Sequence, residues 1–243
     1  MDSLESLRSA ITTCRKCPRL VAWREEVAIL KRAAYQGDTY WGRPVPGFGD
    51  PAARIVVVGL APAAHGANRT GRMFTGDRSG DWLFRAMWKA GLASQPNSDH
   101  VDDGLVLNGA YVTAAVRCAP PANKPTPVER DACRPYLLAE LALLPEWRVV
   151  VVLGAFGYQV VADLLGVRPR PRFGHGVEVP LGENRALLCS YHVSQQNTFT
   201  GRLTETMLDS VFSRAIDLSG RADPQVVQGH PRHRALSGLL GAS

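Results

Sequence analysis

The sequence predicts an α/β fold in which a parallel sheet is covered by helices on both faces. Short, β-branched apolar segments are typical of buried strands, and segments with apolar residues at helical spacing alternate with them along the chain. Such alternation is characteristic of parallel sheets enclosed on two sides. With 243 residues, 45% of them hydrophobic, the chain is long enough for one domain with a sizeable core.

Four apolar runs are predicted to be strands. Each is about as long as an ordinary strand and too short for a helix, and the first and third, RIVVVG and RVVVVL, are the richest in valine. Nearly continuous apolar runs of this kind indicate burial on both faces. The predicted strands are 54–59, 111–116, 148–153 and 186–191.

Five segments are predicted to be helices because their apolar residues recur every three or four positions. The first starts at Pro18, which suits a first turn, and the second ends near Gly91, a common residue at helix ends. The third begins with a capping box formed by Thr126 and Glu129. The predicted helices are 18–34, 79–92, 126–143, 156–165 and 204–218. They belong to a domain of residues 1–218, and we expect residues 219–243, which lack a periodic pattern, to be a loosely held tail.

Charge and hydropathy restrict the class of protein. The net charge is +6, and only four of the 28 basic residues are lysine. Arginine binds phosphate in bidentate fashion, which favours a nucleic-acid partner, although a GC-rich genome would produce the same bias. No apolar run approaches the length of a membrane span, and the acidic N-terminus does not resemble a signal peptide. We therefore expect a cytoplasmic protein without membrane contact.

The cysteines point to a metal centre. Cys14 and Cys17 form a CxxC pair, and fourteen residues separate Cys118 from Cys133. Four thiolates at these spacings suit either a tetrahedral zinc ion or an iron–sulfur cluster. A thioredoxin-like redox pair is disfavoured because no strand precedes the CxxC. The fifth cysteine, Cys189, stands in an apolar run and is expected to pack in the core.

Three irregular segments follow predicted strands, and in parallel sheets ligands bind beyond the carboxyl ends of the strands. These segments are 61–80, 117–125 and 192–202, and they hold most of the unusual polar residues. The run Gly59-Leu-Ala-Pro-Ala-Ala-His-Gly66 leads into the first segment, and the last segment begins His192-Val-Ser-Gln-Gln-Asn. We therefore expect the functional site where these segments meet.

Together with the four cysteines, these motifs resemble the uracil-DNA glycosylase superfamily, in particular its family 5 (type B) iron–sulfur enzymes. The resemblance extends from Cys14 to Leu218. It implies a three-layer α/β/α sandwich with a central, mainly parallel four-stranded sheet, and a [4Fe–4S] cluster on Cys14, Cys17, Cys118 and Cys133. It further implies a monomeric DNA repair enzyme that hydrolyses the N-glycosidic bond of a uracil flipped out of double-stranded DNA and leaves an abasic site.

The resemblance assigns roles to individual residues. Departure of uracil places negative charge on the base and positive charge on the sugar, so the site must stabilise both. His192 matches the histidine that donates to uracil O2, and Phe74 matches the aromatic residue that stacks on the base. Asp77 and Asn123 would orient water or stabilise the sugar cation, although both residue types are also common in caps and turns. Because no pocket lysine is predicted, the enzyme should be monofunctional, with Lys124 as the one residue to test.

Small residues occupy positions where relatives carry larger or polar ones. Ala61 and Ala63 follow the first strand, and Ala114 precedes Cys118. Together with Gly59, these residues are expected to line the base pocket. A roomier, less polar pocket discriminates weakly, which predicts that hypoxanthine and other deaminated bases are also removed.

The last loop and several arginines are expected to contact DNA. The predicted DNA-binding residues are Gln195, Gln196, Asn197 and Arg202, with Arg69, Arg72 and Arg78 as further candidates for phosphate contacts.

Two other functional classes remain open from the sequence. One is a non-catalytic, damage-sensing DNA-binding module with a structural cluster, favoured by the absence of an acidic residue at Ala61. The other is a nucleotide-binding enzyme that uses the run Gly154-Ala-Phe-Gly157, a weak signal without a full dinucleotide motif.

Overall fold

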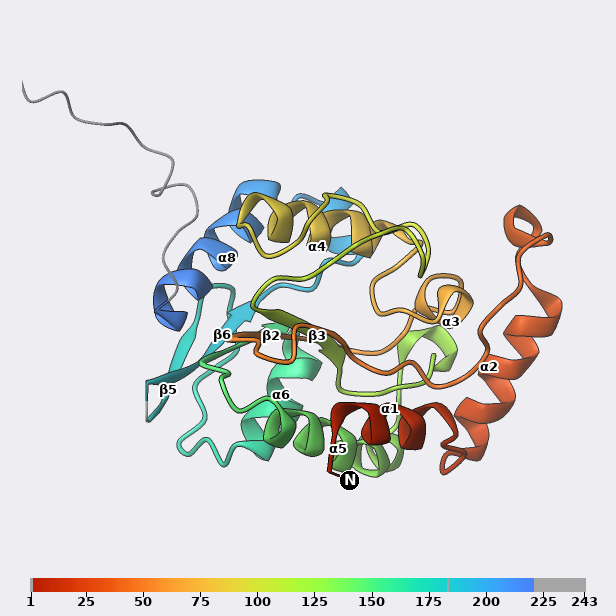
Figure 1. Cartoon of the computed structure of the whole chain (residues 1–243), viewed down its shortest axis with the longest axis horizontal. Helices are drawn as coiled ribbons and strands as arrows, with labels where there is room; N and C mark the ends of the chain where they lie inside the picture. The colour runs from red at the N-terminus through yellow and green to blue at the C-terminus, as the bar shows by residue number, and fades with distance from the viewer. Residues whose placement is uncertain (1, 183, 221–243) are drawn as a thin grey trace, which may run out of the picture.

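A six-stranded mixed sheet lies at the centre of the molecule (Figure 1). The computed structural model describes residues 2–182 and 184–220 of the chain. The strand order is β1-β3-β2-β4-β6-β5, in which the inner four strands are parallel and each edge strand is antiparallel to its neighbour. The strands are β1 (Phe48–Gly49), β2 (Ile55–Gly59), β3 (Ala110–Ala114), β4 (Val149–Leu153), β5 (Glu178–Gly182) and β6 (Arg185–Ser190).

The inner four strands are the four predicted from the sequence, so the expectation of a central parallel sheet is confirmed. Strands β2, β3 and β4 are buried along their whole length, which agrees with their valine-rich composition. The two edge strands were not predicted. β1 has only two residues, and β5 contains Pro180 and alternates between buried and exposed positions, as suits a sheet edge.

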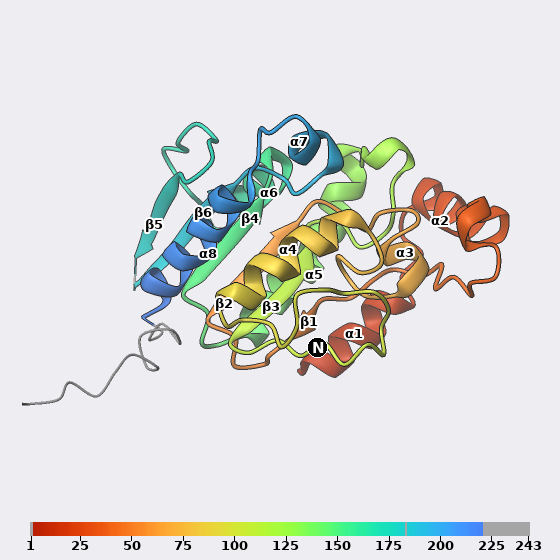
Figure 2. The same ribbon diagram turned by 90° about the horizontal axis from the view of Figure 1, so that it is seen from above.

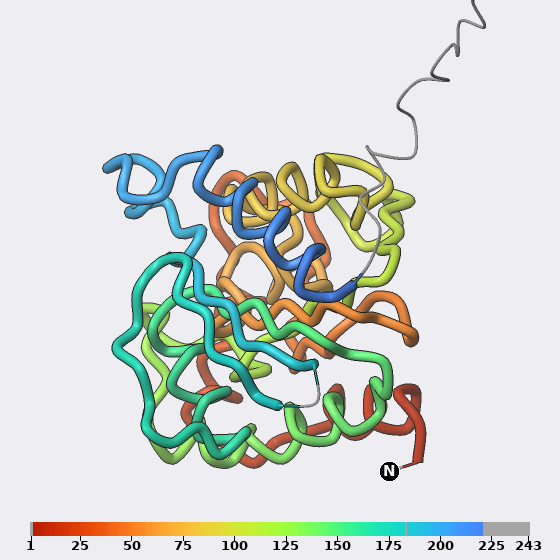
Figure 3. The backbone as a smooth tube through the Cα atoms, turned by 90° about the vertical axis from the view of Figure 1, so that its left-hand side faces the viewer, coloured from red at the N-terminus to blue at the C-terminus, as the bar shows by residue number. Residues whose placement is uncertain are grey.

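Helices cover both faces of this sheet, so that the molecule has three layers: helices, sheet and helices (Figure 3). On one face, α4 and α8 pack against alternate strand residues such as Val57 and Val151. On the other face, α5 and α6 pack against Val56 and Val150, and α1 packs on the outside of α5. The sandwich predicted from the sequence is therefore present. The helices are α1 (Leu4–Thr12), α2 (Pro18–Leu30), α3 (Ala67–Thr70), α4 (Arg78–Lys89), α5 (Pro127–Leu143), α6 (Ala155–Leu164), α7 (Gln195–Phe199) and α8 (Glu205–Ser219), with short 3-10 helices η1 (Ala33–Tyr35) and η2 (Pro121–Asn123).

Local capping explains where several helices begin. Asp77 caps α4 and Thr204 caps α8, while Thr126 and Glu129 form the predicted capping box of α5. Helix α1 was not predicted. Its capping box at Ser3 involves a second serine instead of Glu or Gln.

The C-terminal boundary differs slightly from the prediction. Helix α8 continues through Ser219, and Gly220 ends it in the left-handed conformation. The rest of the predicted tail, residues 221–243, lies outside the described residues. In the described part of the chain, no helix combines the length and apolar character needed to cross a membrane.

The segments that follow the parallel strands gather at one end of the sheet (Figure 2). Helix α3 lies after β2, η2 after β3 and α7 after β6. The long segments 61–80 and 192–202, predicted to be irregular, thus contain the short helices α3 and α7. Because four parallel strands point the same way, residues far apart in the sequence meet at this end.

Candidate active site

A cavity of about 570 Å³ opens at the carboxyl end of the sheet. Its wall comes from the segment after β2, the start of α4, η2, and the segment after β6, which are the segments predicted to build the site. The lining residues are Leu60, Ala61, Pro62, Ala63, Ala67, Met73, Phe74, Asp77, Arg78, Ser79, Ala122, Asn123, His192, Ser194, Gln195 and Gln196.

Phe74 forms one wall of this cavity with an unusual backbone. Its φ of 53° lies in the left-handed region, which costs a non-glycine residue about 1–2 kcal/mol. Its ring lies against the end of β2, where a Cβ built on Gly59 would be only 2.5 Å from the ring Cζ. Its carbonyl oxygen lies even closer to Gly80 in α4, where a Cβ would be 2.0 Å from that oxygen. Glycine at both positions therefore allows the ring to reach the cavity.

His192 lies two residues beyond β6 and lines the same cavity as Phe74. Gly154, with a φ of 93°, makes room for it, because a Cβ there would lie 3.1 Å from the Cβ of His192. Burial lowers the pKa of the His192 imidazole to about 4. The ring is therefore neutral at physiological pH and can donate one hydrogen bond without carrying a charge.

Asp77 is both a cavity residue and the cap of α4. Its Oδ1 accepts hydrogen bonds from the backbone N–H groups of Ser79 at 2.9 Å and Gly80 at 3.2 Å. Its other oxygen lies against Gly66, where a Cβ would be 1.9 Å from Oδ2. Burial raises the pKa of the carboxyl, while the two backbone hydrogen bonds oppose this rise. Asp77 therefore has a structural role in addition to its position at the cavity.

Asn123 enters the cavity wall from η2 and is itself exposed. Its φ of 55° and that of Ala122, 51°, are both in the left-handed region. Asparagine tolerates this conformation better than most residues. The backbone alone therefore favours asparagine at position 123, whatever its role in the chemistry.

The small residues predicted to line the base pocket have different positions. Ala61 and Ala63 lie in the cavity wall, as expected. Gly59 lies behind the ring of Phe74 and is outside the lining set. Ala114 is the last residue of β3, buried in the core between the sheet and α4, and does not line the cavity.

The polar residues of the last loop divide into two groups. Gln195 and Gln196 line the cavity mouth and are exposed. The amide of Asn197 instead donates to the carbonyl of His192 at 2.8 Å, which holds that segment in place. Arg202 is exposed and lies over the ring of Tyr191, 4.7 Å from its centroid, outside the cavity wall.

The three additional arginines also differ. Arg78 lines the cavity and lies over Phe199, with 4.4 Å to the ring centroid. Arg69 pairs with Asp38 at 2.7 Å. Arg72 is buried and bonded within the protein, so its predicted contact with phosphate is wrong. Arg72 is instead part of an internal hydrogen-bond network.

The glycines of the Gly154-Ala-Phe-Gly157 run are explained by packing. Gly154 gives space to His192, and Gly157 lies close to the carbonyl of Val58, 3.3 Å from the position of a Cβ. Both glycines therefore serve close contact between elements, and the nucleotide-binding interpretation loses its main observation.

The four predicted ligand cysteines line one small cavity, together with residues of α2 and α5 and of the segments that precede α2 and follow β3. Arg24, fully buried beside them, donates to the Sγ of Cys118 at 2.9 Å. Burial raises the pKa of the Cys118 thiol to about 12, with Arg24 acting in the opposite direction. Among residues 2–182 and 184–220, no group of three or more His, Cys, Asp or Glu side chains is arranged to hold a metal ion. Cys189 is buried in the core, as predicted.

Comparison with known proteins identifies the family. The model of the Uracil DNA glycosylase superfamily matches residues 46–215. This chain belongs to the uracil-DNA glycosylase superfamily. It is 56% identical to the Type-5 uracil-DNA glycosylase of Mycobacterium bovis over 221 residues, which cover 90% of this chain and 82% of that protein. It is 55% identical to the Type-5 uracil-DNA glycosylase of Thermus thermophilus (89% and 98% covered) and 48% identical to that of Pyrobaculum aerophilum (84% and 88%).

The superfamily resemblance predicted from sequence is therefore confirmed, but two features of the site had no local signal. Arg24 meets Cys118 across 94 residues of sequence. The loop between α4 and β3, residues 90–109, contacts the Phe74 segment through side chains that resemble ordinary loop residues. Contacts between side chains that are far apart in the chain leave no periodic pattern in the sequence.

Proposed function

We propose that this protein is a uracil-DNA glycosylase that hydrolyses the N-glycosidic bond of uracil in DNA during base excision repair. The observation that carries the proposal is the meeting of Phe74 and His192 in one cavity at the carboxyl end of the sheet, in a chain of this superfamily. The cavity opens to the surface, so a base rotated out of a duplex can enter it.

The chemistry follows from the residues around the cavity. The ring of Phe74 would stack on the base, and the neutral imidazole of His192 would donate to the O2 atom, where negative charge develops as the bond breaks. Asp77 and Asn123 also line the cavity and would orient water toward the sugar carbon or stabilise its positive charge. Gln195 and Gln196, at the mouth, would contact the DNA left behind by the flipped nucleotide.

Oligonucleotides that each carry one lesion test this function directly. The chain is incubated with single- and double-stranded DNA containing uracil, and alkali then cleaves any abasic product. We expect scission only after incubation with the enzyme. Binding without release of the base would instead support a damage-sensing module. Borohydride should trap no covalent complex, because Lys124 lies outside the cavity wall.

The same assay tests the range of bases. Ala61 and Ala63 present only methyl groups to the cavity, and an apolar wall excludes larger bases only weakly. We propose that hypoxanthine is also released. Activity on uracil alone would contradict this part of the proposal.

Two substitutions of Asp77 should separate its effect on catalysis from its effect on stability. Replacing it with asparagine keeps an acceptor for the backbone of α4 but removes the charge, so kcat should fall while stability stays close to that of the wild type. Replacing it with alanine removes the cap as well and should lower the free energy of unfolding by about 1 kcal/mol. The measurements are single-turnover kinetics and urea denaturation. An unchanged kcat in Asp77→Asn would leave Asp77 as a cap alone.

We further propose that Cys14, Cys17, Cys118 and Cys133 hold a [4Fe–4S] cluster. The four cysteines line one shared cavity, which supports a common metal group held by all of them. The buried cation of Arg24 would compensate the negative charge of four thiolates. When bound, the cluster would tie the segment between α1 and α2 to β3 and α5.

Replacing Cys133 with serine should abolish iron binding and the broad visible absorption of the purified protein. Cys189→Ala is the matched control, because this cysteine is buried elsewhere and should leave the iron content unchanged. Iron and zinc are measured by mass spectrometry. Zinc in place of iron in the wild-type protein would contradict the cluster.

We propose a monomer that acts on a flipped base in double-stranded DNA, because Phe74, Asp77, Asn123 and His192 of one chain line a single cavity. None of the five cysteines, all of which lie in the described residues, forms a disulfide, which supports a reducing compartment such as the cytoplasm.

A further inference from the structure

The left-handed backbone of Phe74 needs support from its surroundings, because an unsupported chain would relax to a more favourable conformation. The residues next to it supply that support. Thr75 is fully buried, and its Oγ1 lies 2.7 Å from the Oγ of Ser98. The N–H of Gly76 donates to the carbonyl of Ser98 at 2.8 Å. The segment that carries Phe74 is therefore bonded to the loop between α4 and β3.

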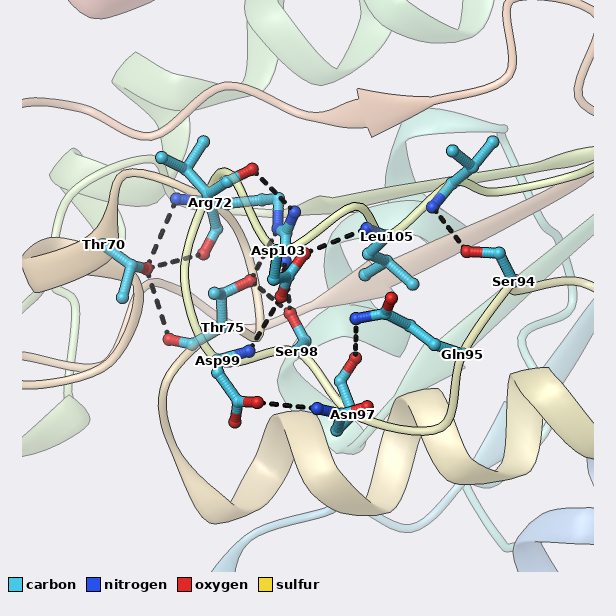
Figure 4. Close-up of polar contacts among 12 residues, drawn as sticks. Thr70, Arg72, Thr75, Ser94, Gln95, Asn97, Ser98, Asp99, Asp103 and Leu105 are labelled. Atoms are coloured by element: carbon cyan, nitrogen blue, oxygen red, sulfur yellow. Dashed lines mark hydrogen bonds and ion pairs between the residues drawn. The ribbon is translucent and has the colours of Figure 1, made fainter.

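A buried guanidinium forms the centre of this contact (Figure 4). Arg72 donates from Nε to Thr75 at 3.0 Å, from Nη1 to the carbonyl of Val101 at 3.0 Å, and from Nη2 to Ser98 at 2.9 Å. Nη2 also pairs with Asp103 at 2.6 Å, and both of these side chains are almost completely buried. All three nitrogens of Arg72 thus have partners, which fixes its orientation. We call Arg72, Thr75, Ser98 and Asp103 the Arg72 cluster.

Asp103 connects this cluster to the backbone of its own loop. Its Oδ2 also accepts from the N–H of Asp99 at 2.9 Å, and its Oδ1 accepts from the N–H of Leu105 at 3.0 Å. Farther along, the N–H of Val106 donates to the Oγ of Ser94, which joins the two sides of the loop (Figure 4). The loop is therefore a rigid support for the Phe74 segment.

We propose that the Arg72 cluster positions Phe74 for base stacking, so that Arg72, Ser98 and Asp103 act on the reaction through the ring of Phe74. None of the cluster residues lines the cavity, and none is in a position to touch a bound base. Charge and hydrogen bonds at the cluster hold residues 72–76 in place, and these in turn hold the ring on Gly59. The inference rests on the proposed function only for its kinetic consequence.

A double-mutant cycle measures this coupling. Asp103→Asn removes the charge opposite Arg72 and should lower kcat/KM on uracil-containing DNA roughly 10- to 100-fold, the scale of a misplaced catalytic geometry. In a Phe74→Ala background the same substitution should change kcat/KM by less than about twofold, because the ring through which it acts is absent. Equal losses in both backgrounds, or no loss in either, would overturn the proposal.

Matched controls distinguish positioning from a general loss of structure. Asp102→Asn changes the exposed neighbour of Asp103 and should leave kcat/KM unchanged. If Asp103→Asn does not fold, Ser98→Ala replaces it in the cycle. Ser213→Ala, at an exposed position of α8 away from this loop, is its control.

A second readout is independent of activity. The seven phenylalanines are labelled as 4-fluorophenylalanine, and the Phe74 signal is assigned with Phe74→Leu. The ¹⁹F resonance of Phe74 should shift or broaden in Asp103→Asn and stay in place in Asp102→Asn. An unmoved Phe74 signal overturns the inference even if uracil excision is confirmed, whereas a moved signal supports it even if the wild-type protein releases no uracil.

Discussion

Replacing His192 with alanine is expected to lower kcat for uracil release about 10²- to 10³-fold, the usual effect of removing one hydrogen-bond donor from a site of developing negative charge. The imidazole lines the cavity together with Phe74. KM should change much less, because the donor acts mainly as charge develops on the base. Single-turnover kinetics measure both quantities.

Two comparisons complete this prediction. His100→Ala, at an exposed position in the loop between α4 and β3, should leave kcat unchanged. The pH profile of kcat in the wild-type protein should show no inflection near 6.5, because burial lowers the pKa of His192 to about 4. A loss of activity between pH 7 and 6 that disappears in His192→Ala would contradict a neutral donor.

The lowered pKa of His192 also makes the free energy of unfolding depend on pH. An unfolded histidine takes up a proton near pH 6.5, whereas folded His192 does so only near pH 4. The contribution of neutral His192 to the free energy of unfolding is therefore complete above pH 6.5 and is lost as the pH falls to about 4. The total loss is about 3 kcal/mol. Urea denaturation should show a shallower pH dependence in His192→Ala than in the wild type.

Replacing Glu140 with alanine is expected to lower the free energy of unfolding by about 3–5 kcal/mol, because it leaves a buried guanidinium without its counter-charge. Glu140 and Arg117 are each 1% exposed, and they form two hydrogen bonds, at 2.9 and 2.5 Å. Glu140 also accepts from Thr113 at 2.7 Å and from the N–H of Gly47 at 3.2 Å. Helix α5 is thereby joined to β3 and to the segment before β1.

A double substitution shows whether charge is the cause. Arg117→Met combined with Glu140→Leu removes both charges while keeping apolar volume, and should recover much of the lost stability. Glu178→Gln, in the exposed pair with Arg214, should have little effect. A double variant no more stable than Glu140→Ala would show that the network of hydrogen bonds matters more than the charges. Thermal and urea unfolding measure all four proteins.

The sequence alone determined the alternation of buried strands and amphipathic helices, and with it the parallel centre of the sheet. It also located the segments that carry Phe74, Asp77 and His192, because motifs after parallel strands must meet at one end of the sheet. These inferences succeeded because burial of a segment and the direction of a strand are encoded in neighbouring residues.

Only the tertiary structure decided which side chains are internal. Arg72 was predicted to contact phosphate and Ala114 to line the base pocket, yet both are buried. The left-handed backbone of Phe74, the pairing of Arg24 with Cys118 and the two edge strands also had no local signal. Each depends on partners far away in the chain, and the sequence pattern around a residue contains no information about what folds against it from a distance.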